Sequence, residues 1–75
     1  MKIEALKIKG WCDTNLSAVA WQRIIVKVSP EFRGSGLKLS SLLNPDATVL
    51  LDDAQYGIIK KAVEETYEVS MAITV

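Results

Sequence analysis

Residues 2–28, KIEALKIKGWCDTNLSAVAWQRIIVKV, are the stretch on which the prediction of the fold depends. Even and odd positions differ in character along this stretch, as they do in a strand that buries one face. From residue 6 to 12 and from residue 16 to 28 the even positions are mainly aliphatic or small, and they are Leu6, Ile8, Gly10, Cys12, Leu16, Ala18, Ala20, Gln22, Ile24, Val26 and Val28. After an apolar start at Ile3 and Ala5, the odd positions from 7 to 11 and from 21 to 27 carry most of the cations and both indoles, and they are Lys7, Lys9, Trp11, Trp21, Arg23, Ile25 and Lys27. This alternation predicts two strands.

Asp13-Thr14-Asn15 lies between the two strands and has the composition of a turn. A loop with an odd number of residues pairs even positions with even positions, which gathers the aliphatic side chains on one face. Because a slip by one residue would turn all of them to water, we expect this register. We therefore predict a β-hairpin from Lys2 to Val28, with one aliphatic face and one face of cations and tryptophans.

A helix over Asp13 to Ile25 is the alternative that the sequence leaves open. Asp13 or Thr14 would be its N-cap. Its apolar stripe would comprise Leu16, Val19, Ala20 and Ile24. The β-branched run from Ile24 to Val26 favours the strand, because such side chains lose rotamer freedom in a helix.

Short segments connect this stretch to the second half of the chain. Ser29-Pro30 is expected to end the second strand, because proline cannot donate to a sheet ladder. Residues 31–36 are predicted to form an exposed loop from which Phe32 folds back onto the core. Residues 37–43 fit either a short strand or one helical turn, and residues 47–51 fit a short strand.

The main helix is predicted to begin after Asp52, a good N-cap, and to extend to about Thr66. Its apolar face comprises Ile58, Ile59, Ala62 and Val63. The spacing of four residues predicts the ion pairs Lys60–Glu64 and Lys61–Glu65. Gly57 is expected where the helix approaches the sheet closely, because glycine has no Cβ.

The last segment alternates from Tyr67 to Val75, with Tyr67, Val69, Met71, Ile73 and Val75 on its apolar face. It is predicted to be a strand with one face on the core. The whole chain, residues 1–75, is thus expected to be a single α+β domain. A small antiparallel sheet, made of the N-terminal hairpin and the C-terminal strand, packs against one main helix, and a fourth short strand is left open.

Composition narrows the classes of function. The chain has 75 residues, no histidine and one cysteine, Cys12, which is expected to be a buried hydrophobe. A small core leaves no room for a deep catalytic cleft, and the commonest general base and zinc ligand is missing. We therefore expect a protein that is not an enzyme and that has no cofactor or metal. We also expect it to be soluble and cytoplasmic, because a single cysteine and a charged N-terminus are not typical of a secreted scaffold.

Charge is unevenly distributed although the net charge is zero. Residues 1–38 carry seven cations and three acids, a net charge of +4, whereas residues 39–75 carry two cations and six acids, a net charge of −4. A two-sided charge distribution orients a charged partner during encounter. Attraction between a basic sheet face and an acidic helix within the fold would explain the same distribution.

The predicted partner-binding residues lie on the odd face of the hairpin and in the following loop. They are Lys7, Lys9, Trp11, Trp21, Arg23, Lys27 and Arg33. Tryptophan and arginine often supply binding energy, and an acidic protein surface would complement these cations. We therefore expect a small non-enzymatic protein that docks on a larger intracellular protein and modulates or inhibits it, as virus-encoded or accessory regulators do.

Two other functions remain open. The same face suits single-stranded nucleic acid, because bases stack on indoles while cations meet phosphates. A purely structural or oligomer-forming domain is the third reading, in which the helix packs on this face and covers both tryptophans. A homodimer through a sheet edge would belong to this third class.

Overall fold

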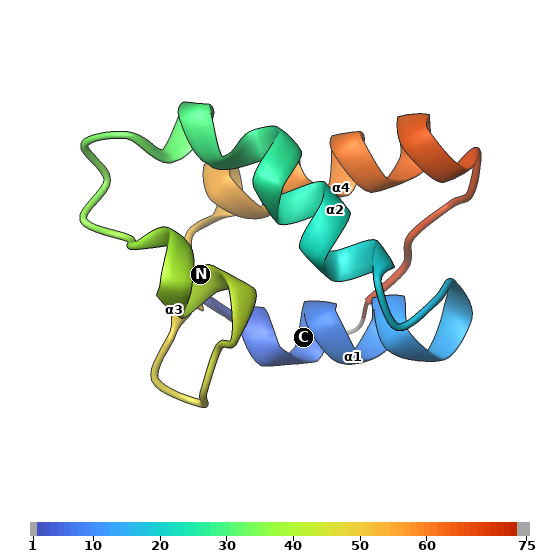
Figure 1. Cartoon of the computed structure of the whole chain (residues 1–75), viewed down its shortest axis with the longest axis horizontal. Coiled ribbons are helices and arrows are strands. Elements are labelled where there is room, and N and C mark those ends of the chain that lie inside the picture. Colours follow the sequence, from blue (N-terminus) through green and yellow to red (C-terminus); the bar gives the residue numbers. More distant parts are fainter. Residues whose placement is uncertain (1, 74–75) are drawn as a thin grey trace.

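The computed structural model describes residues 2–73. Within them the chain forms four α-helices, one 3-10 helix and a two-stranded antiparallel sheet, arranged as a small α+β fold (Figure 1). In chain order the elements are β1 (Ile3–Glu4), α1 (Ala5–Asn15), α2 (Ala20–Val28), η1 (Ser29–Phe32), α3 (Leu39–Leu43), β2 (Leu50–Leu51) and α4 (Asp53–Tyr67). The predicted fold class is confirmed, but most of the predicted strands are not present.

The predicted hairpin over residues 2–28 is wrong, because α1 and α2 occupy nearly all of it. Helix α2 buries Ala20, Trp21, Ile24, Ile25 and Val28, which recur at spacings of one, three and four. These spacings define one face of a helix, with 3.6 residues per turn. The β-branched run from Ile24 to Val26 therefore lies in a helix, where burial of Ile24 and Ile25 outweighs the small cost of restricted rotamers.

Helix α1 shows the same departure from alternation. It buries Ala5, Ile8 and Cys12, again three and four residues apart. Leu6, which belongs to the even set, is 44% exposed. The even positions therefore do not share a face, and α1 has a narrow buried stripe.

The break between the first two helices also differs from its predicted position. Asp13, Thr14 and Asn15 lie in the last turn of α1, where the Asn15 side-chain amide donates to the Trp11 carbonyl at 2.9 Å. The chain turns at residues 16–19, so the single helix over residues 13–25 is wrong as well. Its second half is nevertheless helical, because α2 includes residues 20–25.

The sheet joins two segments that are far apart in the sequence. β1 and β2 are antiparallel, with Ile3 paired to Leu51 and Glu4 to Leu50. The backbone N–H of Ala5 donates to the Val49 carbonyl at 3.0 Å and extends this pairing. The short strand expected within residues 47–51 is confirmed, whereas its partner is the start of the chain.

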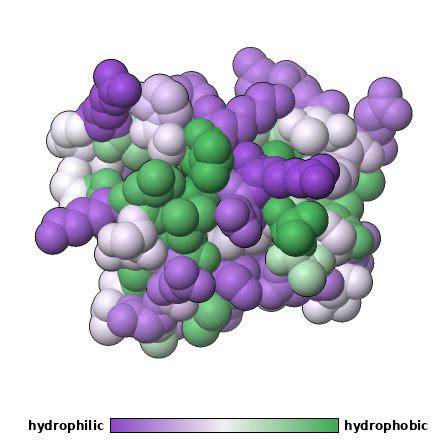
Figure 2. Space-filling model, viewed as in Figure 1, coloured by the Kyte–Doolittle hydropathy of each residue, from purple (hydrophilic) through white to green (hydrophobic). Residues whose placement is uncertain are grey.

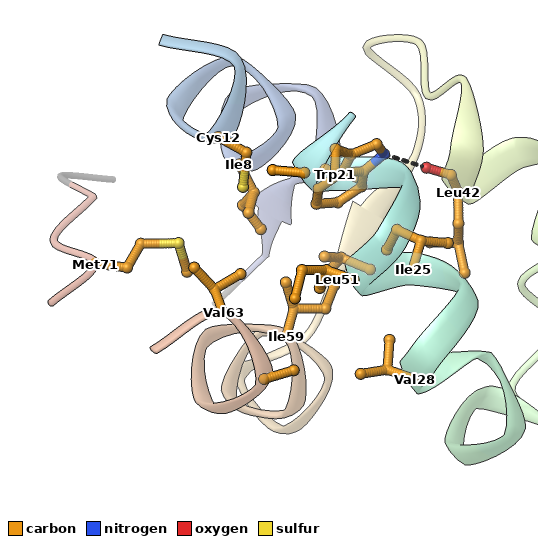
Figure 3. Close-up of a cluster of buried hydrophobic side chains, with 14 of the residues drawn as sticks. Ile8, Cys12, Trp21, Ile25, Val28, Leu42, Leu51, Ile59, Val63 and Met71 are labelled. Carbon is orange, nitrogen blue, oxygen red and sulfur yellow. Dashed lines mark hydrogen bonds between the residues drawn. The ribbon is translucent and has the colours of Figure 1, made fainter. Parts of the chain in front are cut away.

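Helix α2 lies at the centre of the fold and packs against α1, α3 and α4 (Figure 1). Figure 3 shows the core that these helices enclose, with Trp21 and Ile25 of α2 pointing into it. The core comprises Ile3, Ala5, Ile8, Cys12, Ala20, Trp21, Ile24, Ile25, Val28, Phe32, Leu42, Leu51, Ile59, Ala62, Val63 and Met71. Burial of Cys12 and of Phe32 is confirmed. The segment that was ambiguous at residues 37–43 contains the short helix α3, which buries Leu42.

Helix α4 confirms the predicted main helix. The Asp52 side chain accepts from the Gln55 backbone N–H at 2.8 Å, and the Gln55 side chain accepts from the Asp52 N–H at 3.0 Å, which completes a capping box. Lys60 and Glu64 form the predicted ion pair at 3.3 Å. Gly57 is exposed and an added Cβ would meet no atom within 4 Å, so its expected close approach to the sheet is wrong.

The predicted C-terminal strand is wrong over the part that the structure describes. Helix α4 ends at Tyr67, its C-cap Glu68 has a left-handed backbone with φ of 54°, and residues 69–73 form neither helix nor strand. Met71 is buried, and its backbone N–H donates to a carboxylate oxygen of Glu64 at 2.8 Å. Residues 69–73 therefore cover the core with alternating side chains, although they do not form a strand. Residues 74 and 75 of the predicted strand lie outside the described residues.

Candidate interaction surface

The two tryptophans do not form the open face that the sequence predicted. Trp21 is only 1% exposed, and its indole N–H donates to the Leu42 carbonyl at 2.7 Å (Figure 3). Trp11, on α1, is half-buried and packs against the core. A buried indole cannot stack on a base, so Trp21 cannot be the platform that the nucleic-acid hypothesis assigned to it.

The predicted cations are exposed or half-buried, but they lie on different elements. Lys7 and Lys9 belong to α1, Arg23 and Lys27 to α2, and Arg33 to the loop after η1. Lys9 forms an ion pair with Asp13 at 2.7 Å, and Lys27 donates to the Thr66 hydroxyl at 3.0 Å. The single patch of cations and indoles is therefore wrong, because a helix distributes around its axis the side chains that a strand would align.

The structure instead brings apolar and cationic side chains together on the exposed side of α2 and at Val19, the residue before it. Val19, Gln22, Arg23 and Val26 line a shallow depression of about 430 Å³, and we call these four residues the α2 outer face. Val19 is 48% exposed and Val26 is 53% exposed. Both valines are thus available for contact, with the Arg23 guanidinium between them in the sequence.

Figure 2 shows this side of the molecule, where hydrophobic surface lies over α2 and α3 among polar groups. Leu39, at the start of α3, is 44% exposed. An apolar area among polar groups is characteristic of a surface that contacts another protein. Helices α2 and α3 pack on each other, so the area is carried by elements that support one another.

The charges in and around the α2 outer face are positive. No acidic residue occurs from residue 14 to residue 30, whereas Arg23 and Lys27 lie in this range. A surface without acids and with an arginine at its centre attracts acidic groups. Arg23 was among the predicted binding residues. Val19, Gln22 and Val26 were missed, although the seven-residue spacing of the valines is the signal that a helical reading would have used.

The titratable groups with shifted pKa values lie away from this face and have structural causes. Burial, with a smaller contribution from Asp13, raises the pKa of the Cys12 thiol to about 11, so it stays protonated and packs as a hydrophobe. The N–H of Met71 lowers the pKa of Glu64, and Thr48 lowers that of Asp46 through its hydroxyl and its N–H. These shifts reflect folded contacts, and none of them places a nucleophile beside a base.

The described residues contain no cluster of three or more histidine, cysteine, aspartate or glutamate side chains that could hold a metal ion. In the same part of the chain, no helix combines the length and the apolar character that crossing a bilayer requires. The sheet edge considered for a homodimer is short, since β2 has only two residues.

Comparison with known proteins gives no relative. No family model, no curated protein and no solved structure matches the chain. The function therefore has to be inferred from the arrangement of side chains on the surface.

Proposed function

We propose that this protein acts by binding, as a compact module that docks on an acidic surface of a larger intracellular protein and modulates or inhibits it. The α2 outer face is the proposed contact surface. The observation that carries the proposal is the pair of half-exposed valines, 48% and 53%, that flank Arg23 on a helix without acidic residues.

The chemistry of this face supports a protein partner. Apolar contacts at the centre of an interface release water, and an arginine among them gains strength as water is excluded. Arg23 has five donors in a planar arrangement that matches a carboxylate. An acidic partner with an apolar centre would complement both features.

The position of α2 supports the same proposal. Its other side supplies Trp21, Ile24 and Ile25 to the core, so the backbone beneath the face is held by three neighbouring helices. A rigid surface loses little conformational freedom when it binds. The reducing interior of a cell suits the single buried thiol of Cys12.

Affinity capture from the native host tests the proposal when wild type is compared with two substitutions on the face. Val26→Asp places a charge at the apolar centre, and Arg23→Glu reverses the sign. Each is expected to remove the same captured protein, because both positions are exposed and neither substitution disturbs the core. The captured protein should survive nuclease treatment.

Lys7→Glu is the matched control, since Lys7 is an exposed cation on α1 that does not line this face. It should leave capture unchanged. A partner that is lost equally in the control and in the Arg23→Glu protein would point to net charge and would overturn the proposed face. Loss of the partner after nuclease treatment would point to nucleic acid instead.

A further inference from the structure

A second hollow lies apart from the α2 outer face, between the C-terminal part of α2 with η1 and the exposed side of α4. It is a groove of about 500 Å³ with an apolar floor that includes Val28, Ile58 and Ala62. Gly57 also lines it, and an added Cβ there would meet no atom within 4 Å. The groove is therefore open at Gly57 on α4, where no side chain fills it.

Four charged side chains lie along the groove, two on each wall. Lys27 and Glu31 belong to α2 and η1, and Lys61 and Glu65 belong to α4. Each wall thus carries one cation and one anion, four residues apart.

The walls run in opposite directions. Lys27 Nζ donates to the Thr66 hydroxyl at 3.0 Å, near the C-terminal end of α4. Glu31 lies in the groove together with Ala54, near the N-terminal end of α4. Starting from the Thr66 end, one wall therefore presents Lys27 and then Glu31, while the other presents Glu65 and then Lys61.

Three of these four charges have no partner among the described residues. Lys60–Glu64 on α4 and Lys9–Asp13 on α1 close into ion pairs at 3.3 and 2.7 Å. Within residues 2–73, Lys61–Glu65 has the same spacing and forms no such pair, and Glu31 forms none. Lys27 donates to a neutral hydroxyl. The groove thus presents two ammonium groups and two carboxylates that a second molecule can neutralise.

We propose that the groove is a self-complementary interface that binds the same surface of a second copy of this chain. In an interface with two-fold symmetry, each charge must meet its opposite within one and the same patch. The alternating order of the four charges satisfies this condition. A two-fold axis along the groove or across it brings each lysine of one copy towards a glutamate of the other.

The floor permits the close contact that this arrangement needs. Ala54, Gly57 and Ala62 are small, so the α4 wall of one copy can approach the groove of the other. Burial of the half-buried Ile58 would then add apolar contact between the charged rows. This interface is independent of the proposed docking function, since it shares no residue with the α2 outer face.

Analytical ultracentrifugation of the full chain, at concentrations up to about 1 mM, measures the association. We expect a reversible monomer–dimer equilibrium that weakens as salt rises, because the rim charges are exposed. A monomer over the whole range of concentrations would overturn the proposal.

Two glycine substitutions locate the interface. Gly57→Leu fills the groove floor, and Gly10→Leu is its matched control on α1, because both glycines are helical, exposed and free of atoms within 4 Å of a Cβ. Both variants should fold, since leucine favours a helix more than glycine does. We expect at least tenfold weaker dimerisation for Gly57→Leu and none of this effect for Gly10→Leu. An equal effect of the two substitutions, or no effect of either, would contradict the proposal.

Charge exchange tests the self-complementary pattern directly. The K27E/K61E variant has an all-acidic rim, and the E31K/E65K variant has an all-basic rim. Each variant alone should be monomeric because like charges meet across the two-fold axis, and an equimolar mixture should recover a dimer. Dimerisation of either variant alone at the wild-type strength, or a mixture that stays monomeric, would overturn the proposed interface.

Discussion

Helix α2 and the segment at residues 69–73 both alternate in sequence, yet only the first of them is a helix. Helix α2 buries residues from both parity sets, since Trp21 and Ile25 accompany Ala20, Ile24 and Val28. In the C-terminal segment, Met71 is buried and Ser70 and Ala72 are exposed, so the alternation describes its burial correctly. The difference shows that alternation predicts burial only where one parity set is polar.

Spacing by four residues explains why α2 was misread. Ala20, Ile24 and Val28 share a face in a strand and also in a helix, because four is a multiple of two and close to one helical turn. The residues that distinguish the two structures are Trp21 and Val26. The indole is 1% exposed and the valine 53% exposed, which is the reverse of what the strand requires.

Removal of the Trp21 side chain from α2 is expected to have the largest effect on stability. Trp21→Ala should lower the free energy of unfolding by about 3–5 kcal/mol, because it leaves a cavity and an unsatisfied Leu42 carbonyl. Urea denaturation measures the loss. Trp21→Phe, which keeps a ring but lacks the donor, should cost less, and Trp11→Ala should cost about 1 kcal/mol because that indole is half-buried. Equal losses at the two tryptophans would contradict the asymmetry seen here.

Met71 makes the corresponding test for the extended segment. Met71→Ala should cost about 2–3 kcal/mol, since the side chain is 1% exposed and fills the core beside Val63 (Figure 3). The same denaturation experiment applies. Ser70→Ala, at the exposed neighbouring position, should change the free energy of unfolding by less than about 0.5 kcal/mol. Similar losses for both substitutions would mean that the segment does not cover the core as described.

The point at which α4 ends and the extended segment begins is set at Glu68, with its positive φ of 54°. Glu68→Gly should stabilise the protein by about 1 kcal/mol, because glycine adopts the left-handed conformation without a Cβ clash. Thermal unfolding measures the gain. Glu65→Gly, within the helix, should instead destabilise by about 0.5 kcal/mol. Destabilisation by both substitutions would place the end of the helix elsewhere.

The hydrogen bond from Met71 N–H to Glu64 predicts a small dependence on pH. This bond, with help from Lys60, holds the pKa of Glu64 below its ordinary value in the folded protein. The ionised carboxylate therefore stabilises the fold above the unfolded pKa, and this contribution is lost as the pH falls through the lower folded pKa. Amide hydrogen exchange at Met71 should accelerate, relative to intrinsic rates, in that acidic range.

Glu64→Gln should remove this pH dependence, because the amide does not titrate there. Glu65→Gln is the neighbouring control and should retain it. A Met71 amide whose relative protection is unchanged across the acidic range in the wild type would show that the carboxylate does not hold the segment.

Local chemistry made part of the structure predictable. Asp52 as an N-cap and the apolar face of Ile59, Ala62 and Val63 define α4 from neighbouring residues alone, because a cap and a 3.6-residue period act within one element. The burial of Cys12 and Phe32 was predictable from their chemistry. Apart from Arg23, the α2 outer face was not predicted, because Gln22 and Val26 had been assigned to the buried face of a strand and Val19 to neither face.

The sequence by itself determined the α+β class, the position of α4 and the set of residues with enough apolar surface to form a core. Only the tertiary structure decided that α1 and α2 are helices and that the start of the chain pairs with Leu50–Leu51. A residue that fits two local periods takes the conformation that buries more of its neighbours, and this burial depends on elements that are distant in sequence. The same cause places Trp21 inside and Val26 outside, and with them the surface that is available to a partner.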